Sequence, residues 1–304
     1  MTSSAAIPER RLGNLAGILA MIASMAAFTA NDTCVKLLAE HLPVGEIIVL
    51  RNTAATLLIL AYATVFGGLT LPEDAPRRLL TWRMTAEVLS TLFFLSALVR
   101  MPIADATAIA QCTPLAMTAA AAIFLKEPVG WRRWLAAIVG FLGVLLIVKP
   151  GTGTFSLEAI LILIAVALVV GRDLITRLIS GSVPTLTLTL MSAASVMPSG
   201  FALLPFETWV WPAPHEWAKV ATAGLFLSCG YALIVVAMRA GDVAIIAPFR
   251  YAVILFGLIS GYLIWGQFPD GLQMLGIAIL TAAGLYTFHR ERLAAGLSSR
   301  PEMR

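Results

Sequence analysis

Asn31-Asp32-Thr33-Cys34-Val35-Lys36 ends a long apolar run with an acid and a base four residues apart. A second apolar run ends in the same way, with Arg172-Asp173-Leu174-Ile175-Thr176-Arg177. The two acids are 141 residues apart, and so are the two bases Lys36 and Arg177. Three further matches keep this offset of 141: Pro43 with Pro184, Pro128 with Pro269, and Gly143 with Gly284. The chain is therefore predicted to consist of two repeats, residues 1–150 and 151–304.

The composition indicates a membrane protein. Of the 304 residues, 59% are hydrophobic and only 12% are charged, about half the charge of an ordinary soluble domain. The formal charge of +4 gives little support to nucleic-acid binding, because the bases gather in alternate loops, as membrane topology requires. The three cysteines, Cys34, Cys112 and Cys229, lie in apolar segments and predict neither a disulfide nor a metal site.

Ten apolar runs are long enough to cross a hydrocarbon core of roughly 30 Å as helices. In chain order they cover residues 13–38, 44–66, 81–100, 103–125, 131–149, 156–180, 184–205, 216–238, 242–265 and 271–289. The first run follows Arg10-Arg11 and resembles a secretory signal. We interpret it as the first membrane helix instead, because the second half of the chain contains a matching segment.

The basic residues predict the orientation of these helices. With a cytoplasmic N-terminus, most of the 21 Lys and Arg residues fall on the cytoplasmic side. The exceptions are Lys36, Arg100, Lys149 and Lys219 outside, and Arg51, Arg172 and Arg250 within helices. This distribution predicts two cytoplasmic termini. Since each repeat holds an odd number of helices, the predicted fold is all-α, with ten transmembrane helices in two inverted five-helix repeats, an architecture typical of transporters.

Charged residues inside membrane helices normally face a partner or a water-filled cavity. Asp32 and Arg51 lie roughly 10 Å from the outer surface by helix rise, and Arg172 and Asp173 lie at a similar depth from the inner surface. We predict two gates that open alternately, Asp32 with Arg51 outside and Asp173 with Arg172 or Arg250 inside. The alternative is local, with each acid neutralised by the base four residues later on its own helix.

Glu87 is the single carboxylate of the third predicted helix. As a buried acid it is a candidate proton carrier or substrate ligand, and a structural ion pair with Arg83, four residues earlier, or with Arg51 is the alternative. Ser90 and Phe94 lie near the same helical face, and Tyr231 lies on the corresponding stripe of the eighth helix. These polar and aromatic side chains are predicted to line a substrate cavity, with plain helix packing as the alternative.

The fourth and ninth predicted helices contain prolines and small residues within apolar segments. Further candidate cavity residues here are Gln111 near Pro114, and Arg250 and Tyr251 after Pro248. Proline frees backbone carbonyls, and small residues allow membrane helices to approach closely, so we expect these two helices to cross at the pseudo-twofold axis. Asp105, at the start of the fourth helix, is interpreted as an N-cap.

Two sets of segments carry a family resemblance. They are Asp105-Ala-Thr-Ala-Ile-Ala-Gln-Cys-Thr-Pro114, Phe124-Leu-Lys-Glu127-Pro128, Trp134 and Gly140-Phe-Leu-Gly143 in the first half, and Ala247-Pro-Phe-Arg-Tyr251 and Tyr262-Leu-Ile-Trp-Gly-Gln267 in the second. With the two five-helix halves, they resemble the EamA branch of the drug/metabolite transporter superfamily, although Gln267 stands where that family usually has Glu. The Asn31-Asp32, Lys36 and Arg51 pattern resembles members proposed to carry amphiphilic metabolites, alongside amino-acid exporters.

The resemblance implies a secondary transporter of the bacterial inner membrane that works by alternating access. The expected cargo is a small amphiphilic metabolite, an amino acid in the first instance, including aromatic ones, moved outward. A nucleoside-like or vitamin-like metabolite, moved inward, is the alternative. The sequence has no Walker loop, nucleophile elbow or complete zinc motif, so neither an enzyme nor a cofactor is predicted. The expected partners are the substrate and the lipid bilayer, and proton coupling stays open.

Overall fold

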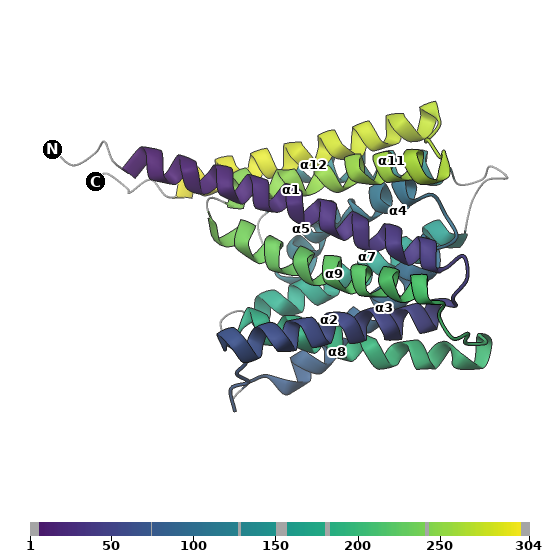
Figure 1. The fold of residues 1–304 in the computed structure, drawn as a ribbon. Coiled ribbons are helices and arrows are strands. Elements are labelled where there is room, and N and C mark those ends of the chain that lie inside the picture. Colours follow the sequence, from purple (N-terminus) through teal and green to yellow (C-terminus); the bar gives the residue numbers. More distant parts are fainter. Residues whose placement is uncertain are drawn as a thin grey trace.

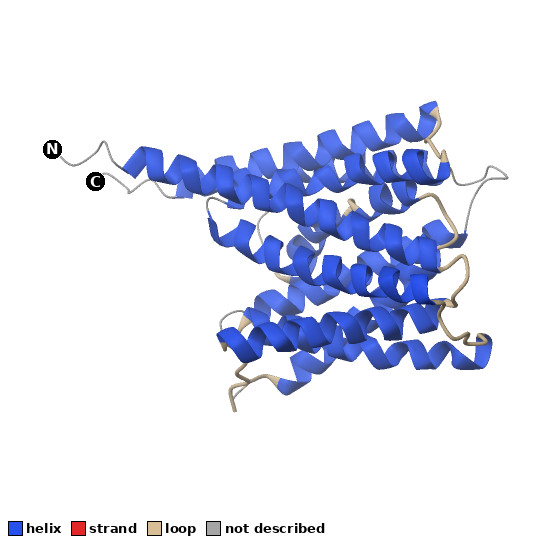
Figure 2. Ribbon diagram, in the orientation of Figure 1, coloured by secondary structure: helices blue, strands red, loops and turns tan. Residues whose placement is uncertain are grey.

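The computed structural model describes residues 6–73, 75–126, 129–149, 157–179, 183–240 and 243–298, with the backbone alone at 6–12, 243–244 and 291–298. Every regular element of these segments is helical (Figure 2). The first half contains α1 (Ala6–Leu38), α2 (Val44–Phe66), α3 (Arg77–Leu98), α4 (Ile103–Ala110), α5 (Thr113–Phe124) and α6 (Trp131–Val148). The second half contains α7 (Leu157–Leu178), α8 (Thr185–Val196), η1 (Met197–Phe206), α9 (Pro214–Ala240), α10 (Val243–Ile246), η2 (Ala247–Tyr251), α11 (Ala252–Trp265) and α12 (Gly271–Ser298).

The predicted set of ten membrane-length segments is confirmed. Nine helical spans of the described chain are long and apolar enough to cross a membrane, and three of them join shorter pieces: α4 with α5, α8 with η1, and η2 with α11. The tenth is α3, whose 22 residues are sufficient in length although it is not one of these nine apolar spans. The predicted repeat boundary at 150/151 lies outside the described residues, so the division of the chain at that point stays a prediction.

The helices pack in a pattern that repeats between the two halves. α1 packs along α9 and α3 packs along α7, so the first helix of each half lies on the third helix of the other half. The equivalent helices α6 and α12 pack together, as do α2 and the α8–η1 segment. Such an exchange is what a pseudo-twofold axis produces. With five spans in each half, α1 and α7 cross the bundle in opposite directions, as the inverted repeat predicts.

The two ends of the bundle are named here by the chain termini. α1 begins and α12 finishes at one end, which we call the terminal end; the α1–α2 connection lies at the other, the distal end (Figure 1). Proline starts the second span of each half, because Pro43 and Pro184 are the N-cap residues of α2 and α8, in extended conformations of φ −68°, ψ 153° and φ −59°, ψ 143°. These two prolines, matched by the offset of 141, therefore have the same structural role.

The fourth span is broken between α4 and α5, as the position of Pro114 predicts. Pro114 has no N–H to donate to the carbonyl of Ala110, and the Thr113 hydroxyl donates to that carbonyl instead, at 2.6 Å. The span packs on its counterpart α11, where a Cβ added to Gly257 would lie 2.6 Å from Oγ1 of Thr107. The close approach expected of these two helices therefore depends on a small residue at 257.

The N-cap prediction for Asp105 is wrong. α4 begins directly after Pro102, its N-cap residue, so Asp105 lies inside the first turn. The Asp105 side chain is 6% exposed and accepts a hydrogen bond from Nε2 of Gln273 at 2.8 Å. This carboxylate therefore joins α4 to α12 rather than capping its own helix.

The contact between α6 and α12 depends on two glycines. A Cβ added to Gly143 would lie 2.8 Å from the carbonyl oxygen of Gly276, and a Cβ added to Gly276 would lie 2.6 Å from that of Gly143. Neither neighbour is a flexible side chain, so the helices themselves would have to move apart. Small residues of this kind set the distance between membrane helices.

We expect Gly276→Ala to lower the free energy of unfolding by about 1–3 kcal/mol, because overpacking forces the two helices apart. The matched control is Gly171→Ala in α7, where an added Cβ meets nothing within 4 Å; alanine there is expected to be neutral or to stabilise by roughly 1 kcal/mol as the better helix former. Thermal unfolding of the purified variants in detergent measures both. Equal melting temperatures would contradict the close α6–α12 contact.

Candidate functional site

A cavity of about 530 Å³ opens between α2, α8 and α9. Its polar and aromatic lining residues are Tyr62 and Phe66 of α2, Thr185 and Thr189 of α8, and Ser228, Tyr231 and Arg239 of α9. A second cavity, of about 550 Å³, adjoins it and shares Thr185, Leu186 and Arg239. These residues come from the last turns of α2 and α9 and the first turn of α8, so both cavities face the terminal end. Each volume suits a small-molecule ligand.

α2 and α9 form a wedge around this cavity. In the distal half of the bundle they touch, since a Cβ added to Gly224 would lie 2.6 Å from Cβ of Ala54 and 3.2 Å from the carbonyl oxygen of Arg51. Towards the terminal end the two helices diverge (Figure 1), and the 530 Å³ cavity lies between them. The structure is therefore open between these helices at one end and packed at the other.

Hydrogen bonds between segments close the distal end. They join Glu207 to the Gly45 amide (2.8 Å), Glu46 to the Val210 amide (3.0 Å), Glu40 to the Trp265 indole N–H (3.3 Å), and Asp270 to Lys149. The Lys149 ammonium lowers the pKa of the Asp270 carboxyl below its ordinary value. Carboxylates that accept from amides and cations in this way hold loops together, and here they bridge segments from both halves of the chain.

Lys36 belongs to this distal closure. Its Nζ donates to the carbonyl oxygens of Leu98 and Met101 at 3.1 Å and 2.6 Å, and it lies 5.5 Å from the ring centroid of Trp265. The local alternative that pairs Asp32 with Lys36 is therefore wrong. The Lys36 ammonium joins the α3–α4 connection to the end of α1 through these hydrogen bonds.

Asp32 and Arg51, which we call the distal charge layer, lie just below this closure. Arg51 is 4% exposed, and its Nε is buried with no hydrogen-bond partner in the described chain. Arg51 is the cation whose charge acts on Asp32, but the described residues include no ion pair between them. Asp32 instead accepts from Nδ2 of Asn31 at 2.9 Å through Oδ1. The two opposite charges of this layer are therefore not joined by an ion pair among the described residues.

The second layer, nearer the terminal end, is fully connected. Glu87 is 5% exposed and lies 3.1 Å from Arg172 and 3.9 Å from Arg83. Arg172 also lies 2.8 Å from Asp173. We call these four residues the terminal charge layer; they come from α3 and α7 and balance in charge. The alternative pair of Glu87 with Arg83 is therefore present, but the shorter contact is with Arg172, which was not predicted, and none with Arg51 occurs among the described residues. The predicted Asp173–Arg172 contact exists, whereas its gating role stays a prediction.

Sequence reasoning missed two hydroxyls that complete the terminal charge layer. Ser192 accepts from Arg83 Nη1 at 2.8 Å and donates to Glu87 Oε2 at 3.3 Å, and Thr176 accepts from Arg83 Nε at 3.0 Å. The signal for Ser192 was present, because it stands 141 residues after Arg51. An arginine in the distal layer is thus matched by a serine in the terminal layer.

The remaining predicted cavity residues have different surroundings. Tyr231 lines the 530 Å³ cavity. The Ser90 hydroxyl donates to the Glu87 carbonyl at 3.0 Å, and Phe94 packs against the hydrophobic core. The Tyr251 hydroxyl donates to the Gln111 carbonyl at 3.4 Å, so both residues belong to helix packing.

Arg250 is the last of the predicted residues. It is half-buried, and among described residues it forms neither an ion pair nor a hydrogen bond, although the charge of Asp173 acts on it. The structure therefore brings Arg250 near the terminal charge layer without joining it to that layer. Glu127, part of the family resemblance, lies outside the described residues.

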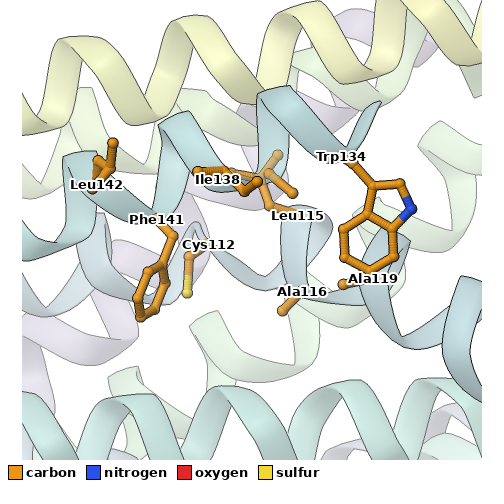
Figure 3. Close-up of a pocket in the computed structure, with 9 residues that line it drawn as sticks. Cys112, Leu115, Ala116, Ala119, Trp134, Ile138, Phe141 and Leu142 are labelled. Carbon is orange, nitrogen blue, oxygen red and sulfur yellow. The ribbon is translucent and has the colours of Figure 1, made fainter. Parts of the chain in front are cut away.

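A third cavity has a different character. About 290 Å³ in volume, it lies between α5 and α6 and is lined by apolar side chains and the Cys112 thiol, among them Leu115, Trp134, Ile138 and Phe141 (Figure 3). Several of these side chains are exposed on the outside of the bundle. Recognition of a polar metabolite needs convergent polar groups, which this lining does not offer. The candidate substrate site is therefore the α2–α8–α9 cavity with the charge layers beyond it.

Comparison with known proteins agrees with this arrangement. The sequence profile described as the EamA-like transporter family matches residues 15–149 and again 156–288. A solved crystal structure shares the fold, with a TM-score of 0.65 at 20% identity over 93% of this chain and 99% of that chain. The two profile matches follow one another along nearly the whole chain.

Three relatives are named as transporters of different compounds. An S-adenosylmethionine uptake transporter of Rickettsia bellii is 27% identical, covering 91% of this chain and 95% of its own. A pseudopaline exporter of Pseudomonas aeruginosa is 26% identical, covering 88% and 94%. A riboflavin transporter of Rhizobium johnstonii is 26% identical, covering 95% of both. These relatives share the transport of small molecules, whereas their cargoes and directions differ.

Glu87→Gln is expected to lower the free energy of unfolding by about 1.5–3 kcal/mol, because it removes charge-assisted contacts of a buried carboxylate and leaves two partly buried arginines facing one carboxylate. The control is the double variant with Arg83→Gln, which restores charge balance and should regain part of that stability. Thermal unfolding in detergent at constant pH measures both variants. If Glu87→Gln unfolds like the wild type, the terminal charge layer is not a structural network and Glu87 returns as a candidate proton carrier.

Proposed function

The chain belongs to the EamA-like transporter family, and from that premise we propose that it carries an amino acid outward across the bacterial inner membrane by alternating access. The family and the named relatives are transporters, not enzymes. The chain is accordingly a multi-pass membrane transporter of a small molecule. The amino-acid cargo, the outward direction and the membrane are the parts that we propose.

The distal charge layer carries the cargo proposal. Arg51 and Asp32 offer one unpaired positive and one incompletely paired negative group, as an amino acid requires. An aromatic pair lies nearby, with the rings of Phe28 and Tyr231 edge to face at 5.4 Å between centroids. Tyr231 also lines the 530 Å³ cavity. A small molecule with a charged head and an apolar or aromatic tail matches this combination.

Alternating access is supported by the contrast between the two ends. The distal end is joined by hydrogen bonds between segments, whereas cavities open towards the terminal end. With the termini in the cytoplasm, as the basic residues predict, this is an inward-facing state. Asp32 with Arg51 is the proposed outer gate, and Asp173 with Arg250 is the proposed inner gate, beside the Arg172–Asp173 contact. Among the described residues neither gate pair is joined, so in this state the hydrogen bonds between segments close the distal end. The halves that exchange roles are the proposed repeats, residues 1–150 and 151–304.

A vitamin-like or nucleoside-like cargo, taken up rather than exported, is the second candidate. It is favoured by the names of two relatives, the S-adenosylmethionine uptake transporter and the riboflavin transporter. Proton coupling has less support in the structure, because Glu87 is already bound by Arg172 and Arg83. A carrier that exchanges its cargo without a proton gradient fits this geometry.

Counterflow into liposomes tests the cargo proposal directly. Purified protein is reconstituted into liposomes loaded with one unlabelled compound, and uptake of the same labelled compound is followed for a panel of amino acids, riboflavin, S-adenosylmethionine and nucleosides. We expect exchange of amino acids, strongest for aromatic ones because of Phe28 and Tyr231. Protein-free liposomes give the background. Exchange of riboflavin or S-adenosylmethionine without exchange of any amino acid would replace the first proposal with the second.

A further inference from the structure

The two charge layers differ in how many of their charged groups have an ion-pair or hydrogen-bond partner. In the terminal charge layer each carboxylate contacts an arginine, and Ser192 and Thr176 take further hydrogen bonds. In the distal charge layer Arg51 donates no hydrogen bond to any group of the described chain, and its Nε is buried. A buried guanidinium without a partner is costly, and within a membrane such a group marks a binding site or an ion pathway. The distal layer is therefore the incomplete one.

Asp32 and Asn31 also have hydrogen-bonding atoms without partners, but these atoms are acceptors, whereas Arg51 has unpartnered donors. One oxygen of Asp32 accepts from Asn31, and its other oxygen has no partner in the part of the chain that the structure describes. The Asn31 side-chain oxygen is buried and also has no hydrogen-bond partner there. Lys36, the cation one helical turn away, donates its hydrogen bonds to backbone carbonyls instead. Two acceptors are thus available beside one another, in the same layer as Arg51, with which they form no ion pair or hydrogen bond among the described residues.

From this geometry we infer that the distal charge layer binds both charges of a zwitterionic α-amino acid. Arg51 binds the carboxylate of the substrate through its guanidinium, and Asp32 with the Asn31 side-chain oxygen binds the ammonium group. A carboxylate suits a guanidinium because two parallel N–H groups can meet its two oxygens. The ligand then supplies the contacts that the two side chains do not make with one another.

The substrate side chain has a defined place in this arrangement. Phe28 lies one helical turn before Asp32 on α1, so both share a face of that helix. The Phe28 ring contacts Tyr231 edge to face, and Tyr231 lines the cavity that opens to the terminal end. A bound amino acid would have its charged head at Arg51 and Asp32 and its side chain against Phe28 and Tyr231, with entry through the α2–α9 wedge.

This inference rests on the proposed amino-acid cargo and is tested by competition in counterflow. Labelled phenylalanine is exchanged in the presence of unlabelled phenylalanine, phenethylamine, which lacks the carboxylate, or 3-phenylpropionate, which lacks the ammonium. In the wild type each single-charge analogue should compete at least about tenfold more weakly than phenylalanine, since each loses a charge-assisted hydrogen bond. Arg51→Gln should reduce the preference for phenylalanine over phenethylamine, and Asp32→Asn the preference over 3-phenylpropionate.

Two variants serve as controls. Arg51→Lys keeps the positive charge and should keep a preference for the carboxylate, which separates recognition from a loss of folding. Arg100→Gln makes the same change as Arg51→Gln at an exposed arginine whose side chain, among the described residues, donates only to the Ser96 carbonyl, and it should leave all three affinities unchanged. The competition experiment with the wild type needs no variant. It can therefore overturn the zwitterion site even if Arg51→Gln does not fold.

The outcomes separate this inference from the proposed function. If the wild type exchanges no amino acid, the cargo proposal is wrong and the zwitterion site falls with it. If the wild type exchanges phenylalanine but both single-charge analogues compete equally well, the cargo proposal stands and the zwitterion site is wrong. Equal loss of affinity for all three compounds in Arg51→Gln and Asp32→Asn would likewise overturn it.

Discussion

A charge inside a bilayer must be paired, hydrated or bound to a ligand, and this constraint organises the interior of the protein. The terminal charge layer meets it within the protein, because Glu87 and Asp173 contact Arg172 and the hydroxyl of Ser192 completes the set. The distal charge layer does not, because the described residues include no ion pair between Arg51 and Asp32, and the buried Nε of Arg51 has no hydrogen-bond partner there. One layer therefore joins the helices around it, while the other has the unpartnered groups on which the proposed substrate site rests.

The inverted repeat is the structural basis of the proposed alternating access. The packing of α1 on α9 has its counterpart in the packing of α3 on α7, so equivalent contacts exist at both ends of the bundle. In the state seen here α2 and α9 touch around Gly224 and separate around Tyr231. Exchange of the roles of the two halves would reverse this. The two halves are not identical in chemistry, since Arg51 in one half corresponds to Ser192 in the other.

The sequence predicted the architecture because hydropathy and the offset of 141 can be read directly from the order of residues, without knowledge of how the helices pack. Ten spans, the inverted repeat and the break at Pro114 all follow from local chemistry. The sequence did not predict the partners of the charged residues, because those partners depend on how the helices pack. Lys36 binds the carbonyls of Leu98 and Met101, and every residue has a carbonyl, so no sequence pattern marks those two. Likewise Glu87 meets Arg172 across a contact between the two halves, whereas its neighbour Arg83 was visible from the spacing of four.

The central claim is that one bundle opens at its two ends in turn. Spin labels on α9 and its neighbours test it, with one cysteine pair at His41 and Trp217 for the distal end and another at Tyr62 and Val236 for the terminal end, in a chain whose native cysteines are replaced by serine. Distances between labels are measured by pulsed electron paramagnetic resonance with and without the amino acid that the carrier exchanges. The account predicts that the substrate shortens the terminal distance and lengthens the distal one. Distances that change in the same direction at both ends, or at neither, would contradict it.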